Sequence, residues 1–180
     1  RSRCLGIRVA APTHDDICAS LKTISIQERI TLPDELATNI SRASSRNMRR
    51  AALMLESAHV STNHTSHLSP TDPIKKTDWE LYITRLAAEV TQEQSPQRLM
   101  AAREKLYELL INCIPASVIL KTLALELLKN LDDEMKHEVM EAAAFYEHRI
   151  AMGSKDIFHL EAFLAKFMAI YKRYLNNLFA

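Results

Sequence analysis

The sequence predicts an all-α protein, in which a small three-helix domain precedes a five-helix domain and one orphan strand stands at the N-terminus. Only 2 of the 180 residues are glycine, and this scarcity favours helices joined by short turns. Hydrophobic residues make up 47% of the chain, which is ample for a buried core. In most of the chain they recur every three or four positions, which is the spacing of one helix face.

Residues 5–9 alternate apolar residues with small or polar ones and end before Pro12, a pattern that predicts a strand. One strand cannot form a sheet alone. We therefore expect it to be the last strand of a sheet whose other strands lie outside this sequence. Residues 1–10 would be the end of a preceding domain, and the start at Arg1 suggests a chain cut from a longer one.

Three short helices are expected between residues 11 and 62. Thr13 and Asp16 have the spacing of a capping box that opens the first helix, and Pro33 with two acidic residues opens the second. The third is expected over about residues 46–59. Their packing residues are Ile17, Leu21, Ile24, Leu36, Ile40, Met48, Ala51, Ala52, Leu55 and Val60.

Residues 63–76 are polar, contain two spaced prolines and lack periodicity, so we predict a linker between two domains. His64 and His67 lie in this segment. Two histidines in a linker are far more often unliganded than part of a metal site, and we assign them no metal.

Five helices are expected over residues 77–180. Each follows a residue pattern that begins helices: a capping box, a Ser-Pro pair, a lone proline, an acidic run and a serine after Gly153. The expected first residues or caps are Thr77, Ser95, Pro115, Asp132 and Ser154.

The last helix is apolar on two sides. Its main stripe runs from Ile157 to Leu178 at alternating spacings of three and four, and a second edge consists of Phe163, Met168, Ile170 and Leu175. Such a helix is not an isolated surface helix. We expect one face to lie in the domain core and the other to contact a partner chain.

Arg46, Arg49 and Arg50 lie where a polar turn enters the third helix. A helix N-terminus already carries partial positive charge, so cations there are unfavourable unless an anion is bound. Backbone N–H groups and guanidinium groups together suit a phosphate. Residues 1–60 carry 9 basic against 6 acidic residues, which favours an anionic partner near this half. The alternative is that the arginines are merely solvated.

Several classes of site are excluded. Neither a Gly-rich phosphate loop nor a dinucleotide-binding turn can be written with two glycines. Cys4, Cys18 and Cys113 are too far apart for a zinc pair, and we expect buried thiols in a reduced protein. We find no nucleophile–base pair, metal-ligand cluster, signal peptide or membrane span. These residues are therefore not expected to be catalytic by themselves.

The chain resembles the small subunits of replication factor C, the eukaryotic sliding-clamp loader of the AAA+ ATPases. The resemblance extends over essentially the whole chain. It is carried by residues 2–4 (SRC) before the strand, 47–51 (NMRRA), 95–99 (SPQRL), 105–115 (KLYELLINCIP), 145–149 (FYEHR) and 158–168 (FHLEAFLAKFM). It implies that residues 1–10 end an AAA+ ATPase core, 11–62 form the AAA+ lid, 63–76 link the domains, and 77–180 form a helical collar domain for oligomerisation.

The resemblance also implies roles for two arginines. Arg3 would be the arginine finger that reaches the nucleotide of a neighbouring subunit. Arg49 would be the sensor 2 arginine, which contacts the phosphates of ATP or ADP bound by its own subunit, with Mg ligands outside this segment. Family members usually carry glycine and an acid before this arginine, whereas this chain has Arg46 and Asn47, so coupling of its lid to hydrolysis is in doubt.

The implied function is subunit assembly and nucleotide sensing in a nuclear hetero-pentamer that uses ATP to load the sliding clamp onto primed DNA in replication and repair. The implied partners are the other replication factor C subunits through the collar, and the clamp and primer-template DNA mainly through the ATPase core, with no membrane. Whether this subunit hydrolyses ATP stays open. The alternative function is a helical scaffold or adaptor that binds no nucleotide.

Overall fold

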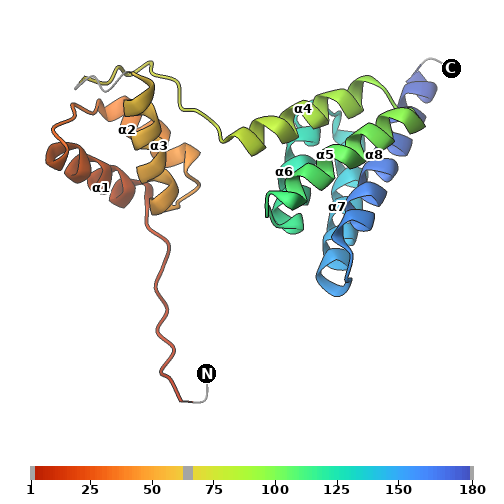
Figure 1. The fold of residues 1–180 in the computed structure, drawn as a ribbon, viewed down its shortest axis with the longest axis horizontal. Coiled ribbons are helices and arrows are strands. Elements are labelled where there is room, and N and C mark those ends of the chain that lie inside the picture. Colours follow the sequence, from red (N-terminus) through yellow and green to blue (C-terminus); the bar gives the residue numbers. More distant parts are fainter. Residues whose placement is uncertain (1–2, 63–66, 179–180) are drawn as a thin grey trace. The chain divides into compact units, whose positions relative to one another are not determined.

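The structure is a computed structural model that describes residues 3–62 and 67–178. Within these residues the chain is all-α, and no sheet is formed. The elements are α1 (His14–Gln27), α2 (Asp34–Ala43), α3 (Met48–Ser61), α4 (Asp78–Gln92), α5 (Pro96–Ile111), α6 (Ala116–Leu128), α7 (Asp133–Met152) and α8 (Asp156–Leu178) (Figure 1). The chain divides into two compact units between Lys76 and Thr77.

The first unit packs α1, α2 and α3 around a small core. The capping box before α1 is present: the Asp16 carboxylate accepts from the Thr13 N–H at 2.9 Å, and the Asp16 N–H donates to Thr13 Oγ1 at 3.2 Å. These contacts lower the pKa of Asp16. The core side chains are Ile17, Leu21, Leu36, Ile40, Ala51, Leu55 and Leu68.

A buried serine ties α1 to α2. The Ser41 hydroxyl donates to the His14 carbonyl at 3.1 Å and lies 3.0 Å from His14 Nδ1. Ser44, also fully buried, donates to the Ser41 carbonyl at 2.8 Å. The sequence pattern had indicated only the apolar contacts between these helices.

The described part of the predicted linker lies against this first unit. Leu68 is 5% exposed within the core, and its N–H donates to the Thr31 carbonyl at 3.2 Å. Ile74 packs on the same core. The segment thus contributes to the three-helix unit as well as leading out of it. His64 lies outside the described residues.

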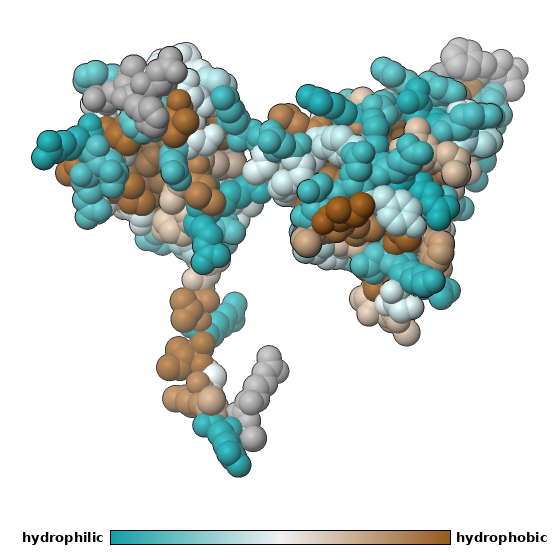
Figure 2. Space-filling view, viewed as in Figure 1, coloured by the Kyte–Doolittle hydropathy of each residue, from teal (hydrophilic) through white to brown (hydrophobic). Residues whose placement is uncertain are grey.

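Residues 5–9 form no strand, so the expected orphan strand is not present as such. Leu5, Ile7 and Val9 are 88%, 78% and 88% exposed. Figure 2 shows brown, hydrophobic side chains along this N-terminal segment, which Figure 1 draws as a long extended stretch before α1. The physical reason is the one that the sequence indicates: a strand needs a hydrogen-bonding neighbour, and none lies within the described residues.

The helix starts of the second unit follow the sequence patterns closely. The Thr77 N–H donates to the Glu80 carboxylate at 3.1 Å, and Ser95 Oγ accepts from the Arg98 N–H at 3.2 Å ahead of Pro96 at the first turn of α5. The last helix begins at Asp156, two residues after the expected start.

Gly153 ends α7, as predicted, although its backbone is not left-handed. A Cβ placed on it would lie 2.5 Å from His159 Nε2 and 2.9 Å from the Arg149 carbonyl oxygen. Glycine is therefore required here because a Cβ would clash with the Arg149 carbonyl in the last turn of α7, and not because of its backbone angles.

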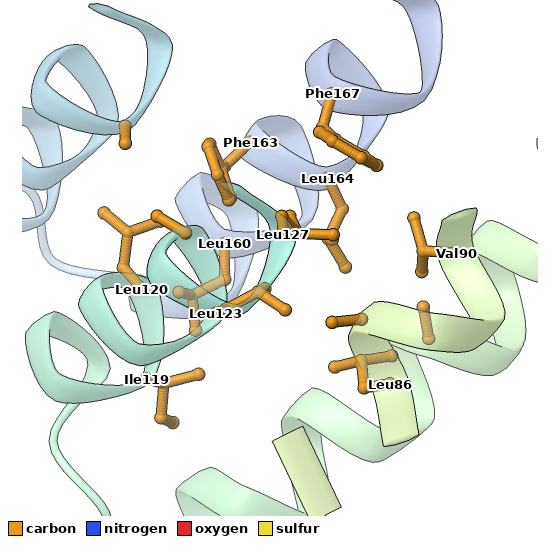
Figure 3. Close-up of a cluster of buried hydrophobic side chains, with 14 of the residues drawn as sticks. Leu86, Val90, Ile119, Leu120, Leu123, Leu127, Leu160, Phe163, Leu164 and Phe167 are labelled. Atoms are coloured by element: carbon orange, nitrogen blue, oxygen red, sulfur yellow. The ribbon is translucent and has the colours of Figure 1, made fainter. Parts of the chain in front are cut away.

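Helix α8 lies at the centre of the second unit. Leu160, Phe163, Leu164 and Phe167 project from it toward α4, α6 and α7, where they meet Leu86, Val90, Leu120, Leu123 and Leu127 (Figure 3). All of these side chains are at most 2% exposed.

The second apolar edge of α8 does not require a partner chain. Phe163, Met168 and Ile170 are all buried within the unit itself, because α4, α5, α6 and α7 surround the helix, and Leu175 is half-buried. The expectation that this edge faces another chain is therefore wrong. Leu178 lies at the end of the helix, and its side chain is outside the described set.

The expectation of buried thiols is also wrong. Cys4 and Cys113 are exposed, and Cys18 is half-buried. Cys113 lies in the turn between α5 and α6 with φ 59°, where its N–H donates to the Leu110 carbonyl at 3.0 Å and its thiol lies 3.8 Å from the Ile111 carbonyl oxygen. None of the helices in the described part of the chain has the length and apolar character needed to span a bilayer.

We predict that Phe163→Ala lowers the free energy of unfolding of the second unit by about 3–5 kcal/mol, because it leaves a cavity among fully buried side chains. The matched control is Phe158→Ala on the same helix. That ring is 49% exposed, and its loss should cost about 1 kcal/mol or less. Urea unfolding followed by fluorescence of Trp79, the only tryptophan and part of this unit, measures both. Equal losses in the two variants would contradict the described core.

Candidate functional site

The turn between α2 and α3 determines which arginines are available at the start of α3. Ser45 and Arg46 have φ angles of 53° and 63°, and the Asn47 N–H donates to the Ser44 carbonyl at 3.1 Å. Two successive left-handed residues that are not glycine are strained, at a cost of order 1 kcal/mol each. The buried Ser44 and the contacts of Arg46 hold the turn in this form.

Arg46 joins the turn to the start of α1. Its Nε donates to the Pro12 carbonyl and its Nη2 to the Ala11 carbonyl, both at 2.9 Å. Because α3 begins at Met48 after the cap Asn47, Arg46 lies outside the helix. The interpretation of three arginines at one anion site is therefore wrong for Arg46, whose guanidinium stabilises the fold.

The N-terminus of α3 carries positive charge without an acidic partner. Asn47 Oδ1 accepts from the Arg50 N–H at 3.1 Å, and the Asn47 carbonyl accepts from the Ala51 N–H at 2.9 Å. The first turn contains no acidic residue. The N–H groups of Met48 and Arg49 have no hydrogen-bond acceptor among the residues that the structure describes.

Arg49 is exposed and stands second in α3, beside these two N–H groups. Within residues 3–62 and 67–178 it makes no hydrogen bond or ion pair. Arg50, in contrast, is half-buried and has interactions of its own. A guanidinium, two backbone donors and the positive end of a helix together can bind an oxyanion such as a phosphate.

Arg3 is exposed near the start of the described chain, and Ser2, its neighbour in the sequence motif, lies outside the described residues. Among those residues Arg3 makes no hydrogen bond or ion pair, and no contact brings it to Arg49. The two predicted site residues therefore do not form one site within this chain.

The second unit exposes large apolar side chains on α5. Met100, Tyr107 and Ile111 are 57%, 41% and 77% exposed, and their spacing of seven and four residues places them on one helix face. The sequence pattern predicts a partner surface on α8 and does not single out this exposed face of α5. The sequence does carry a signal for this face, because α5 has three apolar residues besides the ones that are buried. The buried residues are Ala102, Leu106 and Leu109.

No group of three or more His, Cys, Asp or Glu side chains gathers in a way that could hold a metal ion in the described part of the chain.

Comparison with known proteins identifies both units. Residues 19–60 match the family described as the RCF1/5-like AAA+ ATPase lid domain, and residues 79–175 match the replication factor C subunit 3 C-terminal domain. The chain belongs to the replication factor C family. The resemblance inferred from the residue motifs, and the all-α architecture of a three-helix lid followed by five helices, are confirmed.

Relatives within the family match along nearly the whole chain. Replication factor C subunit 5 of Oryza sativa subsp. japonica is 49% identical over 179 residues, which are 99% of this chain and 50% of that protein. Replication factor C subunit 3 of Mus musculus and of Homo sapiens is 46% identical over 177 residues, 98% of this chain and 49% of each. The chain thus spans about half the length of the curated relatives it matches.

Proposed function

We propose that this chain supplies the lid and the collar of a replication factor C small subunit, which acts in the nucleus in ATP-driven loading of the sliding clamp onto primed DNA in replication and repair. The observation that carries the proposal is the succession of the two family domains, the lid over residues 19–60 and the C-terminal domain over residues 79–175. ATP hydrolysis, Mg coordination, clamp binding and most DNA contacts are assigned to an ATPase core ahead of these residues.

The domain roles follow from this assignment. Residues 1–10 complete the ATPase core, 11–62 form the lid, 63–76 connect the domains and 77–180 form the collar. The exposed, alternating apolar residues Leu5, Ile7 and Val9 support the first of these roles, because a sheet of the core would cover them. The packing of Leu68 on the lid core assigns part of the connector to the lid as well.

We assign Arg49 to nucleotide binding in its own subunit. Its guanidinium and the N–H groups at the start of α3 would contact phosphate oxygens of ATP or ADP, and the absence of an acidic residue from the first turn leaves this end of the helix suited to an anion. We assign Arg3 to the neighbouring subunit, where it would stabilise charge on the phosphoryl group that is transferred. Arg3 and Arg49 do not contact each other among the described residues. This agrees with Arg49 acting on the nucleotide of its own subunit and Arg3 acting on that of a neighbour.

The collar would bind other replication factor C subunits. Since Phe163, Met168 and Ile170 of α8 are covered within its own unit, our candidate for this contact is the exposed face of α5 with Met100, Tyr107 and Ile111. Burial of three such side chains at an interface is favourable by the hydrophobic effect.

Co-expression of this chain with the other small replication factor C subunits, followed by native mass spectrometry, tests the proposed function. We expect a defined hetero-oligomer that contains one copy of this chain. Ile111→Asp, which puts a charge on the α5 face, should reduce the assembled fraction at least tenfold. Leu53→Asp, at a 58% exposed position on the lid helix α3, is the matched control and should assemble normally. A monomer or homodimer indifferent to these subunits would refute the assignment.

Arg3→Ala should leave assembly intact and slow the ATP hydrolysis at the neighbouring site by about 10³-fold or more, the usual contribution of an arginine finger. The measurement is DNA-stimulated ATP hydrolysis by the assembled complex, in which these residues follow an ATPase core. Arg8→Ala removes the same charge from the same exposed segment and should have no such effect. Unchanged turnover in the Arg3 variant would remove the finger role.

Arg49→Ala should weaken nucleotide binding by the same subunit about 10–100-fold, the usual effect of losing a charged hydrogen bond to phosphate. A titration with a fluorescent ATP analogue measures this. Arg29→Ala is the control, because Arg29 is an exposed arginine of the lid that follows the C-terminal end of α1. Identical affinities for the Arg49 variant and the wild type would show that this arginine is only solvated.

A further inference from the structure

An open pocket of about 480 Å³ lies in the collar between the start of α4 and the end of α5. Leu109 and Ile114 contribute apolar surface to it, and Trp79 and Tyr82 contribute two half-buried aromatic side chains. Asp78 and Glu108 place carboxylates at its rim, where both residues are exposed. Its size is in the range of protein pockets that take a ligand or side chain.

Aromatic faces and carboxylates together are the groups that attract an organic cation. Trp79 offers an indole, which has the most favourable ring for a cation–π contact. Neither Asp78 nor the Trp79 N–H has a hydrogen-bond or ion-pair partner in the described residues. The lining contains no lysine or arginine of this chain to neutralise the two carboxylates.

Tyr82 and Glu108 form an oriented pair. The Tyr82 hydroxyl donates to Glu108 Oε2, and burial, followed by the contact with Glu108, raises the pKa of Tyr82 to about 12. The hydroxyl therefore stays protonated at neutral pH and holds the carboxylate in place. Oxygen Oε1 of Glu108 accepts no hydrogen bond among the described residues and is available to a ligand.

Lys105, a cation near the Tyr82 ring, is already engaged in an ion pair. Lys105 Nζ lies 5.8 Å from the centre of the Tyr82 ring, but it forms an ion pair with Glu89. The ion pair with Glu89 therefore neutralises the charge of Lys105, and the carboxylates of Asp78 and Glu108 leave the pocket negatively charged.

We propose that this pocket binds an arginine side chain presented by a segment of another protein. The guanidinium plane would stack on Trp79 and donate to Glu108 Oε1 and to the Asp78 carboxylate. Arginine fits better than lysine because its planar fork combines stacking with paired hydrogen bonds to carboxylates.

Asn112 adds a side-chain acceptor at the pocket edge, which suits a ligand that carries a backbone N–H. Its Nδ2 donates to the Glu108 carbonyl at 2.8 Å, which turns the amide so that Oδ1 is left as an acceptor at the pocket edge. A backbone N–H beside the bound arginine could donate to it. This proposal goes beyond the proposed function, because it specifies the chemistry of a partner and does not require that the partner be a clamp-loader subunit.

Trp79 makes the test direct, because it is the only tryptophan of the chain and lies in the pocket. The tripeptide Ac-Gly-Arg-Gly-NH₂ is titrated into the 180-residue chain while Trp79 fluorescence is recorded. We expect a saturable change, a weaker affinity for the lysine tripeptide, and no saturable change with the citrulline tripeptide, which has the shape of arginine without its charge.

Glu108→Gln should weaken the binding of the arginine tripeptide about tenfold or more, since a charged acceptor is lost. Glu104→Gln, an exposed position on the same helix outside the pocket, is the matched control and should bind as the wild type does. Circular dichroism verifies that both variants are folded. Equal responses to the arginine and citrulline tripeptides, or equal affinities of the two variants, would overturn the proposal. Equal affinities for the tripeptide and for free arginine amide would also overturn it, because the site would then be one for a free cation.

Discussion

The C-terminal domain, which we propose to be the collar, depends on the burial of α8. Phe163, Leu164 and Phe167 sit at most 1% exposed among four surrounding helices, and no other helix of this unit packs against all the rest. Burial of these three side chains alone is worth roughly 5–9 kcal/mol, which is comparable to the net stability of a whole domain. Because α8 is used in this way, the outer face of α5 and the pocket at the start of α4 are two of the surfaces that the described C-terminal domain leaves open to partners.

The lid depends more on polar contacts between its elements than on its small apolar core. Seven buried residues make a small core, and the helices are joined by the Ser41–His14 contact and by the Arg46 guanidinium on the carbonyls of Ala11 and Pro12. These bonds hold the strained turn at Ser45 and Arg46. This turn places Asn47 as the N-cap of α3 and leaves Arg49 exposed at the start of the helix.

Helix positions could be predicted from the sequence because their signals are local. The Thr13–Asp16 and Thr77–Glu80 spacings and Pro96 each act within one helical turn, and the structure has helices at all three. The family could also be predicted, from residue motifs. The predictions that failed concern contacts between residues far apart in the sequence. The sequence does not show whether an apolar edge of α8 meets its own domain or another chain, or whether Arg46 faces solvent or a carbonyl 34 residues away. It also does not show which acidic residues share a pocket with Trp79. Periodicity says which side of a helix is apolar, but not what covers it.

Each of the two candidate sites carries charge that has no ion-pair partner among the described residues, positive at one site and negative at the other. At the start of α3 Arg49, which has no ion-pair partner among the described residues, adds to the positive end of the helix. In the collar pocket two carboxylates, likewise without an ion-pair partner among those residues, lie beside aromatic rings. Elsewhere the chain pairs charges that come close, as in Arg103 with Glu161 at 3.3 Å and Lys22 with Asp34 at 2.7 Å. Charge that is left uncompensated slightly destabilises the free protein, and a ligand of the opposite sign offsets that cost on binding. Under the two proposals the start of α3 would select an anion and the collar pocket a cation, so one ligand class would not serve both.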